Sequence, residues 1–183
     1  MIGKRTLFLA LVAGLFVLSS DPGRAQELRS DAEVSAHADE VMERLRTTNP
    51  EAERLMEIAK AVLVFPRIVK AGLLVGAAGG KGVLREGGTD TGYFLSTAVS
   101  YGLQVGATTF GYVMVLMDDA SLDYVRRTEG WEIGVGPTVT VADEGFAKRL
   151  TSTTLEEGIV VFFVDQSGFF AGAGIEGTKI SRL

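Results

Sequence analysis

The stretch from Ala61 to Gly82, AVLVFPRIVKAGLLVGAAGGKG, decides how this chain folds. It begins as an unbroken apolar run and then gains glycine, which has been absent since Gly23. Of the 23 glycines, 20 lie between Gly72 and Gly177. Glycine costs a helix interior about 1 kcal/mol relative to alanine, whereas in strands it marks bulges, bends and close backbone approaches. The stretch therefore separates a glycine-free helical front from a glycine-rich β body.

The helical front, residues 28–62, is predicted to hold two consecutive helices. Ser30 and Glu33 have the spacing of a capping box, and Asn49 followed by Pro50 is typical of a second helix start. The apolar stripe of the first helix consists of Val34, Ala38, Val41, Met42 and Leu45. The front carries more acids than bases, which favours packing on the body over insertion into a membrane.

The β body, residues 63–183, is predicted to contain many short strands, with one short helix over 118–126. Its fully apolar runs, such as 112–117 and 159–164, predict strands buried on both faces. Gly87-Gly88-Thr89-Asp90 is a turn signal. We therefore expect an α+β fold, in which the N-terminal helices pack on a mainly antiparallel, strongly bent sheet of barrel- or sandwich-like form. The expected strands are 61–65, 68–77, 83–85, 93–100, 103–109, 112–117, 131–135, 138–141, 159–164 and 169–175.

Residues 1–25 have the layout of a secretory signal peptide. Lys4 and Arg5 precede an apolar run from Thr6 to Leu18, and cleavage is predicted near Ala25. The run is short for a membrane span, although an uncleaved anchor remains the alternative. We expect residues 26–183 to form a single domain that is exported to a periplasm or to the cell exterior.

Composition and motifs argue against most kinds of chemistry. The net charge of −5 and the lack of a dense basic tract argue against nucleic-acid binding, and the absence of cysteine excludes thiolate metal sites. The GxGxxG string at 172–177 is followed by too few residues to open a dinucleotide-binding helix. His37 is the sole histidine, and a helix N-terminus accounts for Asp118 and Asp119. We expect a protein without catalytic activity, metal or cofactor.

Two groups of residues remain as candidate binding sites. Gly79, Gly80 and Gly82 do not complete a phosphate loop, but they leave open a backbone nest for an anion. The densest basic group of the body consists of Arg67, Lys70, Lys81 and Arg85. These four side chains are either a site for an anionic headgroup or ordinary solubilising charges, and Arg126 with Arg127 is a second candidate pair.

The order of the β segments resembles the SYLF domain family. The segments that carry the resemblance are Ala59–Pro66, Val69–Gly72, Gly79–Leu84, Tyr101–Ala107, Val113–Met117, Gly158–Phe162, Gly168–Gly172 and Glu176–Gly177. The resemblance extends from about Val34 to Ile180. It implies a non-enzymatic lipid-binding domain, since eukaryotic relatives bind phosphoinositides and some fungal ones bind actin.

Two functions follow from the resemblance and the predicted export. The first is a protein that associates with phospholipid surfaces in the cell envelope through Arg67, Lys70, Lys81 and Arg85. The second is a protein-interaction or scaffold module of the envelope, in which a glycine-rich strand offers its edge to another chain.

Overall fold

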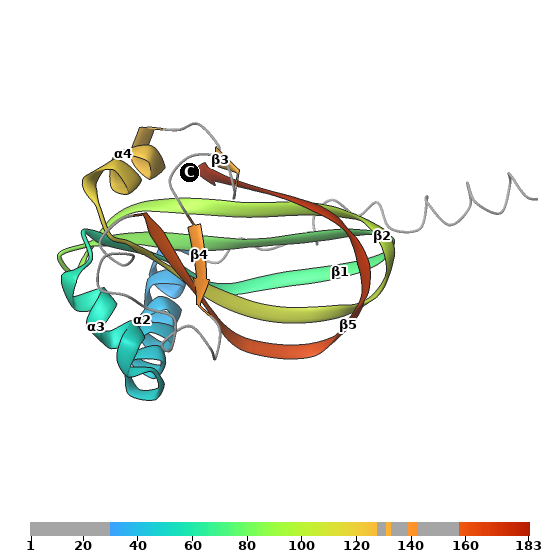
Figure 1. Ribbon diagram of the computed structural model, residues 1–183, viewed down its shortest axis with the longest axis horizontal. Helices are drawn as coiled ribbons and strands as arrows, with labels where there is room; N and C mark the ends of the chain where they lie inside the picture. Colours follow the sequence, from blue (N-terminus) through green and yellow to red (C-terminus); the bar gives the residue numbers. More distant parts are fainter. Residues whose placement is uncertain (1–29, 128–130, 133–138, 143–157) are drawn as a thin grey trace, which may run out of the picture.

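The computed structural model describes residues 30–127, 131–132, 139–142 and 158–183. Two helices lead into a hairpin of two very long strands, followed by a third helix, two short strands and a last long strand (Figure 1). The elements are α2 (Asp31–Thr48), α3 (Pro50–Ile58), β1 (Ala61–Glu86), β2 (Thr89–Leu116), α4 (Asp119–Arg127), β3 (Trp131–Glu132), β4 (Val139–Ala142) and β5 (Ile159–Arg182). The predicted α+β class, with helices ahead of the sheet, is confirmed.

One five-stranded sheet contains all the described strands. Its order is β1-β2-β5-β3, and every neighbouring pair on that path is antiparallel; β4 adds to β5 as a parallel strand. Among the described residues the sheet is open, with β1 at one end of the path and β3 at the other. The prediction of a mainly antiparallel sheet is therefore confirmed, and the described sheet is not closed into a barrel.

Eight of the ten short strands expected from the sequence merge into three long ones, while β3 and β4 stay short. Pro66 and the glycines of 79–82 are expected to separate strands, but β1 continues through both. Its register shifts between Phe65 and Ile68 and between Leu73 and Val75. A β-bulge absorbs an irregular residue without ending the ladder, which explains the difference. Gly87 and Gly88, both at positive φ, form the two-residue turn that joins β1 to β2.

The hairpin doubles back on itself. In Figure 1 the long strands run away from the helices, turn over at the far end and return. The Tyr112 hydroxyl donates a 2.7 Å hydrogen bond to Ser96 of the same strand, and the backbone at Gly80 lies against Arg67. A Cβ at Gly80 would lie 2.2 Å from the Arg67 carbonyl oxygen, so this approach requires glycine.

At the helical end both faces of the sheet are buried. Because side chains alternate along a strand, Val62 and Val64 pack under α2 and α3, while Leu63 and Phe65 enter a second core that includes Leu122 of α4. The predicted stripe of the first helix, from Val34 to Leu45, is the buried face of α2. The runs predicted as doubly buried are confirmed for 112–117 and for 159–162.

The helix boundaries follow the predicted caps. The capping box of α2 is present, and the Asn49 side chain accepts from the backbone of Glu51 and Ala52 at the start of α3. The helices occupy 31–58 of the expected front, and β1 begins at Ala61, two residues before the predicted start of the β body. The described helices include none long and apolar enough to cross a membrane. The predicted leader lies outside the described residues.

Candidate functional site

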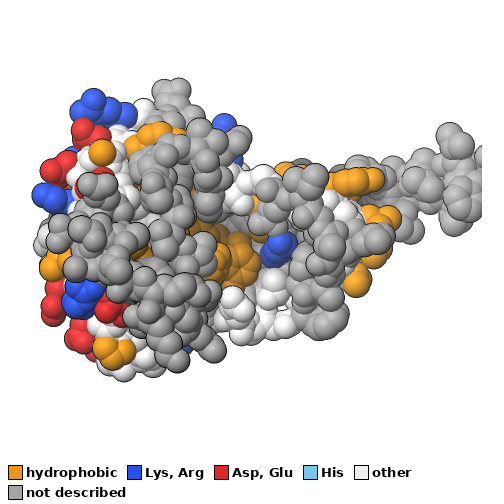
Figure 2. Space-filling view, viewed as in Figure 1, with side chains coloured by type: hydrophobic (Ala, Val, Ile, Leu, Met, Phe, Trp, Pro, Cys, Tyr) orange, Lys and Arg blue, Asp and Glu red, His pale blue; other side chains and the backbone are white. Residues whose placement is uncertain are grey.

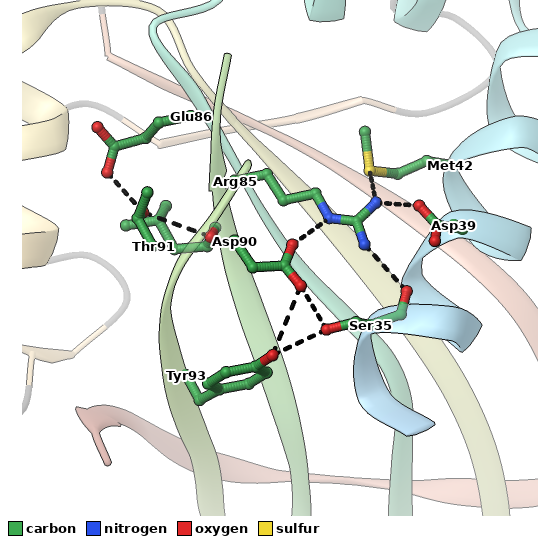
Figure 3. Close-up of polar contacts among 9 residues, drawn as sticks. Ser35, Asp39, Met42, Arg85, Glu86, Asp90, Thr91 and Tyr93 are labelled. Atoms are coloured by element: carbon green, nitrogen blue, oxygen red, sulfur yellow. Dashed lines mark hydrogen bonds and ion pairs between the residues drawn. The ribbon is translucent and has the colours of Figure 1, made fainter. Parts of the chain in front are cut away.

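Arg85, one of the four predicted headgroup cations, lies in a polar network between β1, β2 and α2 (Figure 3). Its Nε donates to the Asp90 carboxylate at 2.8 Å, and one Nη donates to the backbone carbonyl of Ser35 at 3.0 Å. The other Nη forms an ion pair with Asp39 and also contacts the sulfur of Met42. The Arg85 side chain is only 12% exposed, so its donors point into the protein and not toward a ligand.

The pKa values in this network show how tightly the charges are held. Burial by itself raises the pKa of Asp90, but hydrogen bonds from Ser35, Arg85 and Tyr93 outweigh it and leave that pKa lowered. Burial opposes the charge of Arg85 as well, yet Asp39 and Asp90 leave the Arg85 pKa raised. Arg85 and Asp90 therefore stay ionised near neutral pH. One cation between two carboxylates gives no surplus positive charge for an anion.

Lys81 is held in a similar way. Its ammonium forms an ion pair with Asp31 in the first turn of α2 and lies 5.3 Å from the centroid of the Tyr93 ring. Only 14% of the Lys81 side chain is exposed. Lys81 and Arg85 therefore fasten α2 to the hairpin, and the acidic residues of the helical front provide the counter-charges.

Arg67 and Lys70 have different surroundings. Arg67 is exposed and lines a pocket of about 610 Å³ between α2 and the sheet, where Arg44 forms a 3.1 Å ion pair with Asp165. Lys70 lines a neighbouring pocket of about 450 Å³. The two pockets share Phe110, Gln166 and Ser167 on their walls. The four predicted cations thus divide into two that bind α2 and two that border adjacent pockets.

The glycines proposed as an anion nest are strand residues. Gly79, Gly80 and Gly82 pair with Thr97, Ser96 and Phe94 of β2, and none of the three has a positive φ. A nest needs alternating right- and left-handed residues, so the geometry differs from that prediction. Gly80 and Gly82 instead allow the returning half of β1 to pack against its first half.

The second basic candidate, Arg126 with Arg127, lies on α4. Arg126 forms an ion pair with Glu86, and Arg127 pairs with Asp123 one turn earlier at 3.0 Å. Asp118 caps this helix, as expected, through the backbone N–H of Ser121 at 2.6 Å. The second Asp118 oxygen accepts from the N–H of Gly158, also at 2.6 Å, and this contact holds the start of β5.

An apolar pocket of about 280 Å³ lies between the two halves of the doubled-back sheet, and the sequence did not predict it. The Tyr112 hydroxyl lies on its wall with its hydrogen bond to Ser96, and burial raises the pKa of Tyr112. The lining residues are Ile68, Ala78, Ser96, Ala98, Phe110, Tyr112, Val161, Phe163 and Thr178. Because these residues come from strand segments far apart in sequence, local sequence patterns do not predict that they line one pocket.

Helices fastened to an antiparallel sheet by ion pairs, with pockets bordered by cations and aromatic rings, define a binding module. Residues 97–182, from within β2 to the end of β5, match the family described as "Ysc84: Las17-binding protein actin regulator". This match is consistent with a SYLF domain, the family that the order of the β segments resembles. No curated protein matches the chain.

Proposed function

We propose that this chain is a non-enzymatic lipid-binding module that associates with phospholipid surfaces of the cell envelope. The observation that carries the proposal is a pair of adjoining pockets: Arg67 and Phe110 line one, and Lys70, Phe110 and Phe163 line the other. A phospholipid surface presents phosphate beside hydrocarbon, and this arrangement offers cations beside apolar side chains. The match of residues 97–182 to the Ysc84 family supports the same class of function.

Within the predicted headgroup site, the structure favours Arg67 and Lys70 over Lys81 and Arg85. The latter two are mostly buried and bind carboxylates of α2 and β2. A cation near an anionic membrane contributes about 1 kcal/mol, so two of them shift binding by roughly thirtyfold. The contribution is electrostatic and decreases as salt screens it.

Vesicle flotation tests this proposal. Wild-type protein should float with vesicles of phosphatidylcholine mixed with anionic phosphatidylglycerol, and less so at high salt. Replacing both Arg67 and Lys70 by Gln should weaken this association by roughly thirtyfold. The matched control replaces Arg126 and Arg127 by Gln, which removes the same charge from α4 and should leave binding within about twofold. Absence of wild-type flotation with any phospholipid mixture at low salt would refute the function.

The alternative function is a protein-interaction module of the envelope. It is favoured by the family's description as a Las17-binding actin regulator and by the position of β1 at the end of the described sheet. An unpaired strand edge can accept an extended segment of another chain. Co-sedimentation with actin filaments, together with pull-down from envelope extract, measures this function; specific capture without any vesicle association would favour it.

A further inference from the structure

The far end of the doubled-back hairpin exposes a cluster of large apolar side chains. Six of them, each more than half exposed, lie on the segments of β1 and β2 where the strands turn over. We call this cluster the apolar tip; its members are Leu73, Leu74, Val75, Val99, Tyr101 and Val105. Leu73 pairs with Val105 and Val75 pairs with Tyr101 across the ladder, so these residues form one continuous surface. A patch of this kind on a folded domain marks an interaction site.

A backbone irregularity turns three successive apolar residues of the tip outward. The register shifts between Leu73 and Val75, and Leu74 has a φ of 67°. A leucine in this left-handed region is strained, and such strain is found mainly at functional sites. The bulge exposes Leu74 to solvent at a position where a polar residue or glycine would be more favourable.

The distribution of charge along the molecule indicates what the apolar tip contacts. Residues 71–80 and 95–107 contain no Asp, Glu, Lys or Arg. On the face drawn in Figure 2, charged side chains gather at the helical end, and apolar side chains lie at the opposite end. Glu176 is the acid in the neighbouring stretch of β5, where its backbone pairs with Ser100 of β2.

Cations lie at the base of the tip on both sides of the turn. Lys70 is three residues before Leu73, or roughly 10 Å along an extended strand. Lys179 is exposed on β5, opposite Thr97 and two residues from the level of Val99. An uncharged apolar tip with cations roughly 7–10 Å behind it matches a phospholipid surface, in which hydrocarbon lies below an anionic layer of similar depth.

From these observations we infer that the apolar tip enters the hydrocarbon layer of a phospholipid membrane, while Lys70 and Lys179 remain at the level of the phosphates. This inference rests on the proposed function and adds its insertion surface and orientation. The helical end, with its acidic residues, then faces away from the membrane. β2 is paired with β5 throughout the tip and with β1 on either side of the irregularity at 102–104, so most of its backbone groups have partners before they leave water.

Site-specific fluorescence tests the orientation. The chain has no cysteine, so a single cysteine carries an environment-sensitive dye without competing labels. The V75C label lies at the tip, and the T89C label lies at the opposite end, after the hairpin turn. On adding phosphatidylcholine–phosphatidylglycerol vesicles we expect a blue shift and protection from aqueous quenchers for V75C alone. A shift of the T89C label alone, or no shift of either while the protein floats, would overturn the inference and leave the lipid-binding function intact.

Substitution of tip residues tests the same inference without a dye. Leu73→Gln, Val75→Thr and Val105→Thr combined should reduce vesicle association at least about tenfold, because three apolar side chains no longer enter hydrocarbon. The control, Ile58→Gln with Leu183→Gln, replaces exposed apolar residues outside the tip and should bind like wild type. Circular dichroism should show both variants folded. Equal binding by the tip variant and wild type, or a wild-type dimer that does not float and that the tip variant abolishes, would overturn the proposal.

Discussion

The two ends of the long strands have similar apolar sequences, but their side chains have opposite surroundings. At the helical end, Leu63 is fully buried because α2 and α3 cover one face of the sheet and a second core covers the other. At the far end, Leu73 of the same strand is 71% exposed. Both lie in apolar stretches of β1. The comparison shows that packing against other elements, and not the residue pattern, decides whether an apolar strand segment is core or contact surface.

The largest expected effect compares leucine truncation at the two ends. Leu63→Ala removes buried methyl groups and leaves a cavity, so we expect a loss of about 2–5 kcal/mol in the free energy of unfolding. Leu73→Ala removes exposed atoms and should change that free energy by less than about 0.5 kcal/mol. Urea denaturation followed by circular dichroism measures both values. A comparable loss for Leu73→Ala would show that the apolar tip is part of a core. The proposed difference between the two ends of β1 would then be wrong.

The elements that local chemistry defines were predictable from the sequence. Ser30 and Glu33 cap α2, Asp118 caps α4, and Gly87-Gly88 forms the hairpin turn, because each depends on residues within a few positions. Contacts over long separations were not predictable. The ion pairs of Lys81 with Asp31 and of Arg85 with Asp39 span about 50 residues. Because of these ion pairs, two cations predicted to bind a ligand instead connect α2 to the hairpin.

The apolar tip was missed for a related reason. Gly-Leu-Leu-Val at 72–75 belongs to the strand that the sequence predicts over 68–77, and a run of apolar and small residues gives no sign of whether another element will cover it. The merging of predicted short strands has the same origin. Pro66 and the glycines of β1 do interrupt its regular pairing, but neighbouring strands continue beside them and hold the ladder together through the bulges.

An intermediate effect is expected where β1 packs against its own first half. Gly80→Ala would place a methyl group against the Arg67 carbonyl, and we expect a loss of about 1–3 kcal/mol as the backbone shifts. Gly177→Ala is the matched control, since a Cβ there has no neighbour within 4 Å, and it should be nearly neutral. Thermal unfolding of the two variants measures the difference. If Gly80→Ala were as stable as Gly177→Ala, the two halves of the hairpin would not be in contact in solution.

The smallest expected effect concerns pH at the helical end. Burial by itself raises the pKa of Asp118, but hydrogen bonds from the backbone of Gly158 and Ser121 leave it lowered. The folded pKa therefore lies below the unfolded value of about 3.9, so the stabilisation is present above that value and disappears as the pH falls through the folded pKa.

Asp118→Ala should consequently cost about 1 kcal/mol at neutral pH, as is usual for a lost N-cap, and this difference from wild type should shrink below about pH 4. The adjacent Asp119 is largely exposed and pairs with Lys60 at 3.4 Å, so Asp119→Ala should stay close to wild type at every pH. Urea denaturation at neutral and acidic pH measures these differences. A cost for Asp118→Ala that is unchanged under acid would mean that the cap acts through its shape and not its charge. In that case the stabilisation that Asp118 gives to α4 and β5 would not depend on pH. The helical end would then resemble the apolar tip, which has no charged residues to titrate.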